Sequence, residues 1–109
     1  MELAKKKCVP CEGGVPKLTR AMAENYLQEI PGWELVDEKL FKRFRCKGFL
    51  KAIEFVNKMA TIAETENHHP NFTVNYQEVE VTIWTHAIGG LSENDFILAA
   101  KIEEACKTL

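Results

Sequence analysis

The stretch Asn71-Phe72-Thr73-Val74-Asn75-Tyr76-Gln77-Glu78-Val79-Glu80-Val81-Thr82-Ile83-Trp84 decides the fold of this chain. Apolar and polar residues alternate from Phe72 to Tyr76 and again from Val79 to Ile83. Strict alternation is typical of a strand that buries one face. Because only Gln77 and Glu78 separate the two runs, the stretch predicts a tight antiparallel hairpin.

Helical spacing marks three segments around this hairpin. Thr19 is a good N-cap for a short first helix, which Pro31-Gly32 ends. Ser92 is the N-cap of a last helix, with Asp95 at its third position, where a carboxylate meets exposed amides. Between them, a stripe at helical spacing predicts a helix of about four turns, formed by Phe49, Ala52, Ile53, Val56, Ala60 and Ala63.

A second apolar stripe runs along the middle helix through Phe55, Met59 and Ile62. A helix that is apolar on more than one face needs more than one surface to pack against. The second stripe therefore meets either the sheet or another subunit, or it only widens the core face. A small chain with this much apolar surface favours a homo-oligomer.

Two shorter runs, Trp33 to Val36 and Leu40 to Cys46, flank Asp37-Glu38-Lys39 and predict a second hairpin. The order is then helix, two strands, helix, two strands, helix. This order predicts an α+β two-layer sandwich, in which three helices cover one face of a four-stranded antiparallel sheet. Residues 19–109 form this single domain, and residues 1–18 form an N-terminal arm that lies before the folded core.

Composition narrows the classes of function. The chain has 109 residues and a formal net charge of -2, which gives no general basic field for nucleic acid. No apolar run is long enough to span a membrane, and no secretory signal is recognisable, so we expect a cytoplasmic protein.

Four cysteines are too few and too unevenly placed for a disulfide framework. Cys46 and Cys106 lie in apolar patterns typical of a core. Cys8 and Cys11 form a single C-x2-C, which could be half of a metal site completed by another subunit, a redox pair or two ordinary thiols.

The three histidines of the chain, His68, His69 and His86, fall within one short part of the sequence. The first two precede one strand of the predicted hairpin and His86 follows the other, so all three should converge at one sheet edge. His86 shares the parity of Trp84 rather than that of Ile83 and should not be a core residue. A trihistidine metal site is one reading, but adjacent histidines in extended backbone point to opposite faces. Acid/base catalysis and substrate binding fit the pattern better.

The run of Glu64, His68-His69-Pro70, Tyr76, His86 and Asp95 resembles the signature of the pterin-4a-carbinolamine dehydratases. The resemblance extends from about Leu18 to Ala105 and also includes Pro31-Gly32-Trp33, the Phe41-x2-Phe44 pattern and Gly90-Leu91-Ser92. Only the arm with the C-x2-C lies outside it.

The resemblance implies an enzyme that dehydrates 4a-hydroxytetrahydropterin to quinonoid dihydropterin in tetrahydropterin recycling. It implies a homodimer or homotetramer that needs no metal and no cofactor, because the pterin is the substrate. His68 and His86 would be the catalytic acid and base, assisted by His69. Glu64 and Asp95 would orient the imidazoles or favour their protonated forms. Substrate-binding residues would be His69, Glu64, Asp95, Trp33 and Pro70.

Several of these residues also have purely structural readings. Asp95 is explained as a helix-terminus carboxylate, Tyr76 as a residue of the sheet core and Trp33 as an apolar plug after a turn. Two other functions stay open. Some animal members of the family are dimerisation partners of a homeodomain transcription factor, and a related enzyme or binder could serve another pterin pathway, such as that of molybdopterin.

Overall fold

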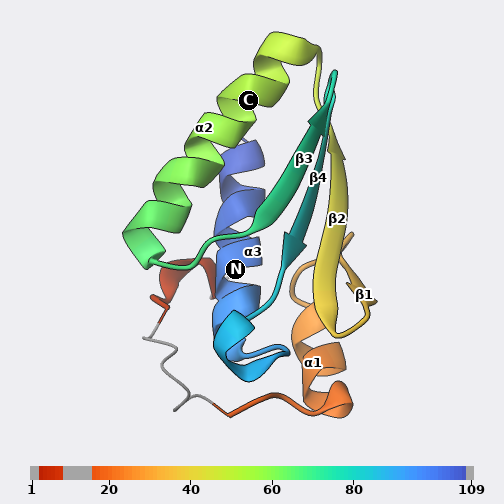
Figure 1. The fold of residues 1–109 in the computed structure, drawn as a ribbon, viewed down its shortest axis with the longest axis vertical. Coiled ribbons are helices and arrows are strands. Elements are labelled where there is room, and N and C mark those ends of the chain that lie inside the picture. Colours follow the sequence, from red (N-terminus) through yellow and green to blue (C-terminus); the bar gives the residue numbers. More distant parts are fainter. Residues whose placement is uncertain (1–2, 9–15, 108–109) are drawn as a thin grey trace.

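The computed structural model describes residues 3–8 and 16–107 and has the predicted element order (Figure 1). After a short 3-10 helix, η1, the chain forms a helix, a hairpin, a long helix, a second hairpin, a second 3-10 helix, η2, and a last helix. Their bounds are η1 Leu3–Lys5, α1 Arg20–Leu27, β1 Glu34–Val36, β2 Lys39–Arg45, α2 Phe49–Glu66, β3 Asn71–Asn75, β4 Glu78–Ile83, η2 His86–Ile88 and α3 Glu93–Cys106. The α+β fold class is confirmed.

The sheet is antiparallel, with the strand order β1-β2-β4-β3. The first hairpin turns at Asp37 and Glu38, which both have positive φ (50° and 59°), as tight hairpin turns require. The second turns at Tyr76, whose φ is also positive (55°). Tyr76 is 70% exposed, so its placement in the strand and sheet core was wrong. Alternation alone did not show where the strand ends.

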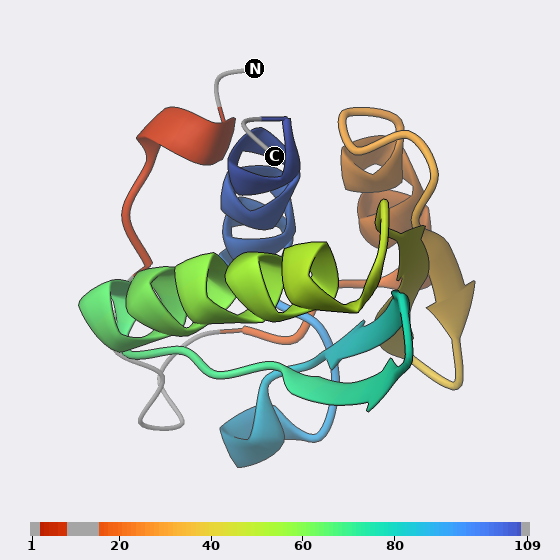
Figure 2. The ribbon, with the colours of Figure 1, turned by 90° about the horizontal axis from the view of Figure 1, so that it is seen from above.

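The helices cover one face of the sheet (Figure 2). On that face, β4 contributes Val79, Val81 and Ile83, all fully buried, as parity predicted. Phe55 of α2 and Phe96 of α3 belong to the same core cluster. No helix of residues 3–8 and 16–107 is both long and apolar enough to cross a membrane.

The middle helix buries members of both apolar stripes, so the second stripe widens the core face, which was one of the expected outcomes. Phe55 and Met59 are fully buried together with Ala52 and Ala63, whereas Phe49 is 49% exposed. Ile53 and Val56 are only partly buried. Two stripes of similar apolarity do not reveal which one faces the sheet, because that depends on how the helix is rotated against its neighbours. Phe55 and Met59 therefore give no argument for a second subunit.

The described part of the arm packs on the core instead of lying before it. Leu3 is buried, and the Lys101 ammonium donates a hydrogen bond to the Ala4 carbonyl oxygen (2.8 Å). Lys6 pairs with Glu93 (2.8 Å), and the Cys8 backbone N–H donates to Glu66 Oε1 (2.8 Å). The arm thus contacts both α2 and α3.

The structure tests the predictions for two of the cysteines, Cys46 and Cys106. Cys46 and Cys106 are partly buried against the core, as expected. Burial raises the pKa of the Cys46 thiol, and burial followed by the charge of Glu103 raises the pKa of Cys106. Both thiols are thereby disfavoured as nucleophiles. Cys11 lies outside the described residues, so the role of the C-x2-C stays open.

Candidate functional site

His68 is directed into the protein by the end of α2. Asn67 caps the helix in the left-handed conformation (φ 52°, ψ 42°), and the His68 backbone N–H returns to the Ala63 carbonyl oxygen (3.1 Å). This left-handed cap is a common way to end a helix and turns the chain sharply. The His68 side chain is then nearly buried and meets Asp95 of α3, with 2.6 Å between Nε2 and Oδ1.

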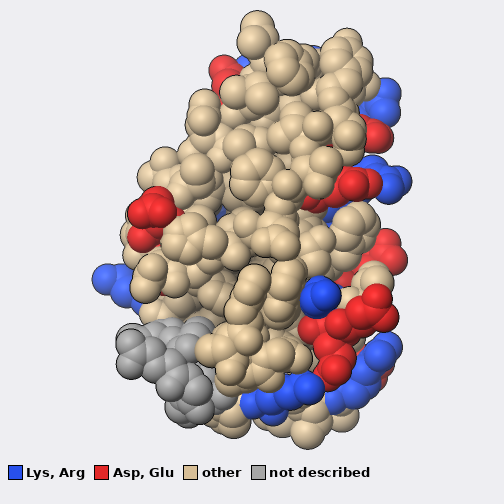
Figure 3. All heavy atoms as spheres, viewed as in Figure 1, with Lys and Arg blue, Asp and Glu red and all other residues tan. Residues whose placement is uncertain are grey.

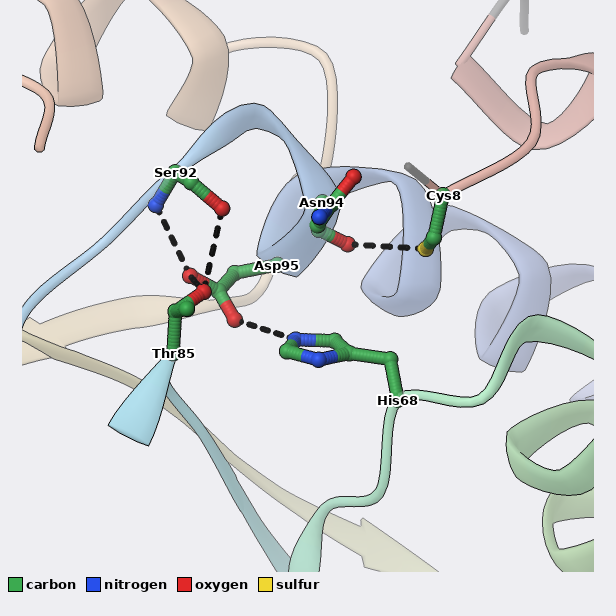
Figure 4. Close-up of polar contacts among 6 residues, drawn as sticks. All are labelled: Cys8, His68, Thr85, Ser92, Asn94 and Asp95. Carbon is green, nitrogen blue, oxygen red and sulfur yellow. Dashed lines mark hydrogen bonds and ion pairs between the residues drawn. The ribbon is translucent and has the colours of Figure 1, made fainter. Parts of the chain in front are cut away.

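Asp95 is fully buried and joins three parts of the fold (Figure 4). Its Oδ1 binds His68, while its Oδ2 accepts hydrogen bonds from the Ser92 backbone N–H (2.9 Å) and the Thr85 hydroxyl (2.9 Å). Ser92 and Asp95 form the predicted capping box of α3. The Asp95 carboxylate therefore does both things that were expected of it: it caps the start of α3 and it binds a histidine.

This arrangement fixes the tautomer of His68. An ionised carboxylate only accepts hydrogen bonds, so the proton of the pair belongs on His68 Nε2. The other ring nitrogen, Nδ1, then carries a lone pair, and no described residue donates to it. In this tautomer Nδ1 is the ring atom of His68 that can accept a proton.

His69 is exposed, whereas the preceding residue, His68, is buried. Its side chain is exposed, and its Nε2 lies 2.9 Å from Glu64 Oε1. Glu64 therefore supports His69, and Asp95 supports His68. The exposed pair can adjust to a ligand, while the buried pair is held in place.

His86 lies on the 3-10 helix that follows β4 and is exposed, in agreement with the parity argument. Its ring stacks on Trp84, with centroids 4.2 Å apart and an interplanar angle of 8°. Lys39 Nζ lies 4.5 Å from the Trp84 ring centroid. The stack holds the imidazole flat against an aromatic wall.

The three histidines line one hollow of about 360 Å³ at this end of the sheet. Its walls are two segments, residues 67–71 and 84–87. Pro70 lines it, as the resemblance implied. The convergence predicted from the hairpin is confirmed, and the hollow is large enough for a small bicyclic ligand.

Trp33 does not line this hollow. It is 4% exposed in the core, where its Nε1–H donates to Glu103 Oε1 (2.9 Å) and its ring meets Phe44 edge-on. Its burial fits the plug reading, and no described contact supports its expected place beside the ligand. The turn at Gly32 directs the side chain inward, under α3.

Three contributors were missed from the sequence. Thr85 supports Asp95, Trp84 stacks on His86, and Asn71 lines the hollow. The position of Trp84, two residues before His86 on the same strand face, was the available signal. No such signal marked Thr85, because its role depends on where α3 begins relative to β4.

No three histidine, cysteine, aspartate or glutamate side chains are grouped to hold a metal ion within residues 3–8 and 16–107. His68 Nε2 and His69 Nε2 each already face a carboxylate. Independence from metal stays a prediction.

Comparison with known proteins gives a consistent family. Residues 16–105 match the family model described as "Pterin 4 alpha carbinolamine dehydratase". A Rubrobacter xylanophilus protein named "Putative pterin-4-alpha-carbinolamine dehydratase" is 47% identical over 103 residues, which are 94% of this chain and 96% of that one. The Arabidopsis thaliana protein "Pterin-4-alpha-carbinolamine dehydratase 2, mitochondrial" is 47% identical over 109 residues, covering 94% of this chain and 58% of its own.

Solved structures agree. A "transcriptional coactivator/pterin dehydratase" from Brucella melitensis superposes with a TM-score of 0.81 at 32% identity, over 84% of this chain and 99% of that one. A pterin dehydratase-like protein identified as a RuBisCO assembly factor in the α-carboxysome has a TM-score of 0.57 at 24% identity, over 68% of this chain and 86% of that one. The second likeness is one of fold alone.

Proposed function

The chain belongs to the pterin 4 alpha carbinolamine dehydratase family of hydro-lyases, and we propose that it converts 4a-hydroxytetrahydropterin to quinonoid dihydropterin and water by histidine acid/base catalysis. The observation that carries the proposal is the hollow in which buried His68, fixed by Asp95, faces the same space as exposed His86. Recycling of tetrahydropterin after a hydroxylase reaction is the proposed context.

The reaction needs one proton donor and one proton acceptor. The bond between C4a and the hydroxyl oxygen breaks as that oxygen is protonated and leaves as water. The proton on N5 passes to a base, and its electron pair forms the double bond between N5 and C4a. We assign the base to His68 Nδ1, because Asp95 holds the opposite nitrogen in its N–H form. His86, on the other wall, supplies the acid.

Substrate binding falls to the flat and polar groups around this pair. Trp84, Pro70 and the His86 ring offer surfaces for a planar ring system. His69 lines the hollow and offers a hydrogen bond to the ligand, and Glu64, which is bonded to His69, supports it from outside the lining. The pterin is the substrate, so the proposed reaction uses no cofactor.

A direct assay tests this function. The purified protein should accelerate loss of the 4a-hydroxyl from chemically generated 4a-hydroxytetrahydropterin, and exhaustive chelation should leave the rate unchanged because histidines supply the proposed acid and base. Absence of acceleration over the buffer rate would contradict the proposed activity. Loss on chelation that zinc or iron restores would instead contradict the metal-free mechanism.

Changing His69 to alanine should mainly raise KM. The side chain is exposed and hydrogen-bonded to Glu64, so we expect it to contribute binding that is equal in ground and transition states. Steady-state kinetics with the same carbinolamine checks the split between KM and kcat. A fall in kcat as large as that of His86→Ala would place His69 in the proton transfer instead.

We also propose that the protein is a homodimer or homotetramer. The exposed apolar residues that support this proposal are not Phe55 and Met59, which were first expected to do so. Phe49, Leu50 and Phe72 are 49%, 78% and 44% exposed, and they lie on α2 and β3. Figure 3 shows few charged side chains over the middle of the face that these elements present. Sedimentation at micromolar concentration should show more than one chain, and Leu50→Glu should weaken the association. A monomer at that concentration would refute the proposal.

A role as an interaction partner is the alternative, and the Brucella melitensis relative carries "transcriptional coactivator" in its title. A stoichiometric complex unaffected by histidine substitution, together with no dehydratase activity, would favour it. Service to another pterin pathway predicts activity on a different carbinolamine. A cytoplasmic location stays a prediction.

A further inference from the structure

The last residue of α2, Glu66, carries a charge at a place that disfavours one. Its side chain is only 8% exposed, and it lies at the helix C-terminus, where the partial negative charge of the backbone carbonyl groups opposes a carboxylate. A buried carboxylate also loses its hydration, which destabilises the fold unless protein groups replace the water. Specific partners must therefore compensate the Glu66 charge.

Two partners from distant parts of the chain do so. The Cys8 backbone N–H donates a hydrogen bond to Glu66 Oε1 (2.8 Å), and the Lys101 ammonium of α3 lies 3.6 Å from Oε2. Lys101 also donates to the Ala4 carbonyl oxygen (2.8 Å), so it binds the arm as well. Figure 2 shows the described arm running from beside α3 to the end of α2. We name this set of contacts, made by Ala4, Cys8, Glu66 and Lys101, the arm clasp.

The arm clasp lies next to the buried histidine pair. Glu66 precedes His68 by two residues, and the Cys8 thiol donates to the carbonyl oxygen of Asn94 (3.6 Å), the residue before Asp95. Figure 4 shows Cys8 and His68 reaching these neighbouring residues of α3. The arm therefore connects the end of α2 to the start of α3 close to the point where His68 meets Asp95.

The distance between these two segments matters for the proposed base. The hydrogen bond between His68 Nε2 and Asp95 Oδ1 (2.6 Å) sets the tautomer that leaves Nδ1 as the proton acceptor. Asp95 is held from its own side by Ser92 and Thr85, whereas His68 is carried by the end of α2. A misplacement of about 1 Å can reduce a rate by about 10²-fold. Contacts that fix the end of α2 against α3 therefore also fix the base.

We infer that Glu66 is a positioning residue for the proposed base: by joining the arm to α2 and α3, it keeps His68 against Asp95. The inference rests on the proposed dehydratase function. Glu66 does not belong to the lining of the histidine hollow, so it acts through His68 and does not touch the ligand. Its loss should therefore lower kcat and leave KM nearly unchanged.

Three variants of the full-length chain test the inference. Glu66→Ala removes both contacts of the carboxylate and should lower kcat by about 10- to 100-fold. Glu66→Gln should retain most of kcat, because its amide oxygen can still accept from the Cys8 N–H. Glu103→Ala is the matched control, since it also removes a largely buried carboxylate paired with a lysine, Lys42, but towards the other end of α3. It should lose stability and keep kcat.

Nitrogen NMR of the His68 ring gives a readout that needs no substrate. It distinguishes the nitrogen that carries a proton from the one with a lone pair. The wild type and Glu103→Ala should both carry the proton on Nε2, whereas Glu66→Ala should show a mixture of the two tautomers. If Glu66→Ala does not fold by circular dichroism, Lys101→Met, which removes the ammonium of the arm clasp, should show both changes to a smaller extent.

A lower kcat together with the tautomer change at His68, in a folded variant and not in Glu103→Ala, supports the inference. An unchanged kcat, an unchanged His68 ring or an equal loss in the control overturns it while the dehydratase function stands. Absence of activity in the wild-type protein removes the proposed function, and the inference with it.

Discussion

Truncating His86 to alanine should lower kcat by about 10²- to 10⁴-fold, the loss typical of a missing general acid or base. The side chain is exposed and stacks on Trp84, so its removal should barely affect folding. The effect would then belong to the chemical step. Single-turnover kinetics with chemically generated carbinolamine measures it, and circular dichroism confirms the fold.

His68→Ala should lower kcat by a similar factor, and the double variant should be far worse than either single one if each histidine partly covers for the other. His69→Ala is the internal control, since it removes an imidazole from the same hollow without removing a proposed proton carrier. A near-wild-type kcat in folded His86→Ala would refute the assignment of the acid. His86 would then be only a polar residue after a strand.

The second large effect is expected at Asp95. In Asp95→Asn the amide oxygen can still accept from Ser92 N–H and Thr85, while its NH₂ faces His68 Nε2. That donor forces the imidazole into the tautomer that carries its proton on Nδ1, so the proposed base is lost. We expect kcat to fall by about 10²- to 10⁴-fold with a largely intact fold.

Asp95→Ala separates stability from catalysis. It removes the carboxylate of the capping box, leaves the His68 ring without its acceptor and leaves the Thr85 hydroxyl with Ser92 Oγ alone, so unfolding should become about 2 to 4 kcal/mol easier. Urea denaturation measures this loss. Asp37→Asn, in an exposed turn where asparagine tolerates positive φ, is the matched control for the amide substitution. An active Asp95→Asn enzyme would show that the tautomer of His68 does not matter.

Sequence reasoning predicted the parts of this site that depend on local rules. Alternation around Val81 and the short turn predicted the hairpin. The hairpin in turn predicted that His68 and His86 lie close together. Ser92 and Asp95 were recognisable as a capping pair because that motif is local. These rules need no knowledge of how distant elements pack.

The errors arise where a side chain's partner lies on another element. Trp33, expected beside the ligand or as an apolar plug, is buried against Glu103, and Phe55, expected to meet the sheet, a second subunit or a wider core face, lies in the core. Tyr76 fits a strand by parity, yet a positive φ places it in the turn. Helix rotation and turn geometry decide all three, and a one-dimensional pattern contains neither.

The docked arm matters for how this domain is cut or fused. Through Cys8 it contacts Glu66, two residues before His68, and through Lys6 it contacts Glu93, two residues before Asp95. The matched family region begins only at residue 16, so Lys6 and Cys8, which make these two contacts, both lie before it. A shortened chain that starts at residue 16 would keep every proposed catalytic group. It would lose the arm that connects the segment carrying His68 to the segment carrying Asp95. Boundaries drawn for expression, fusion or transplantation of this activity should therefore include the first eight residues.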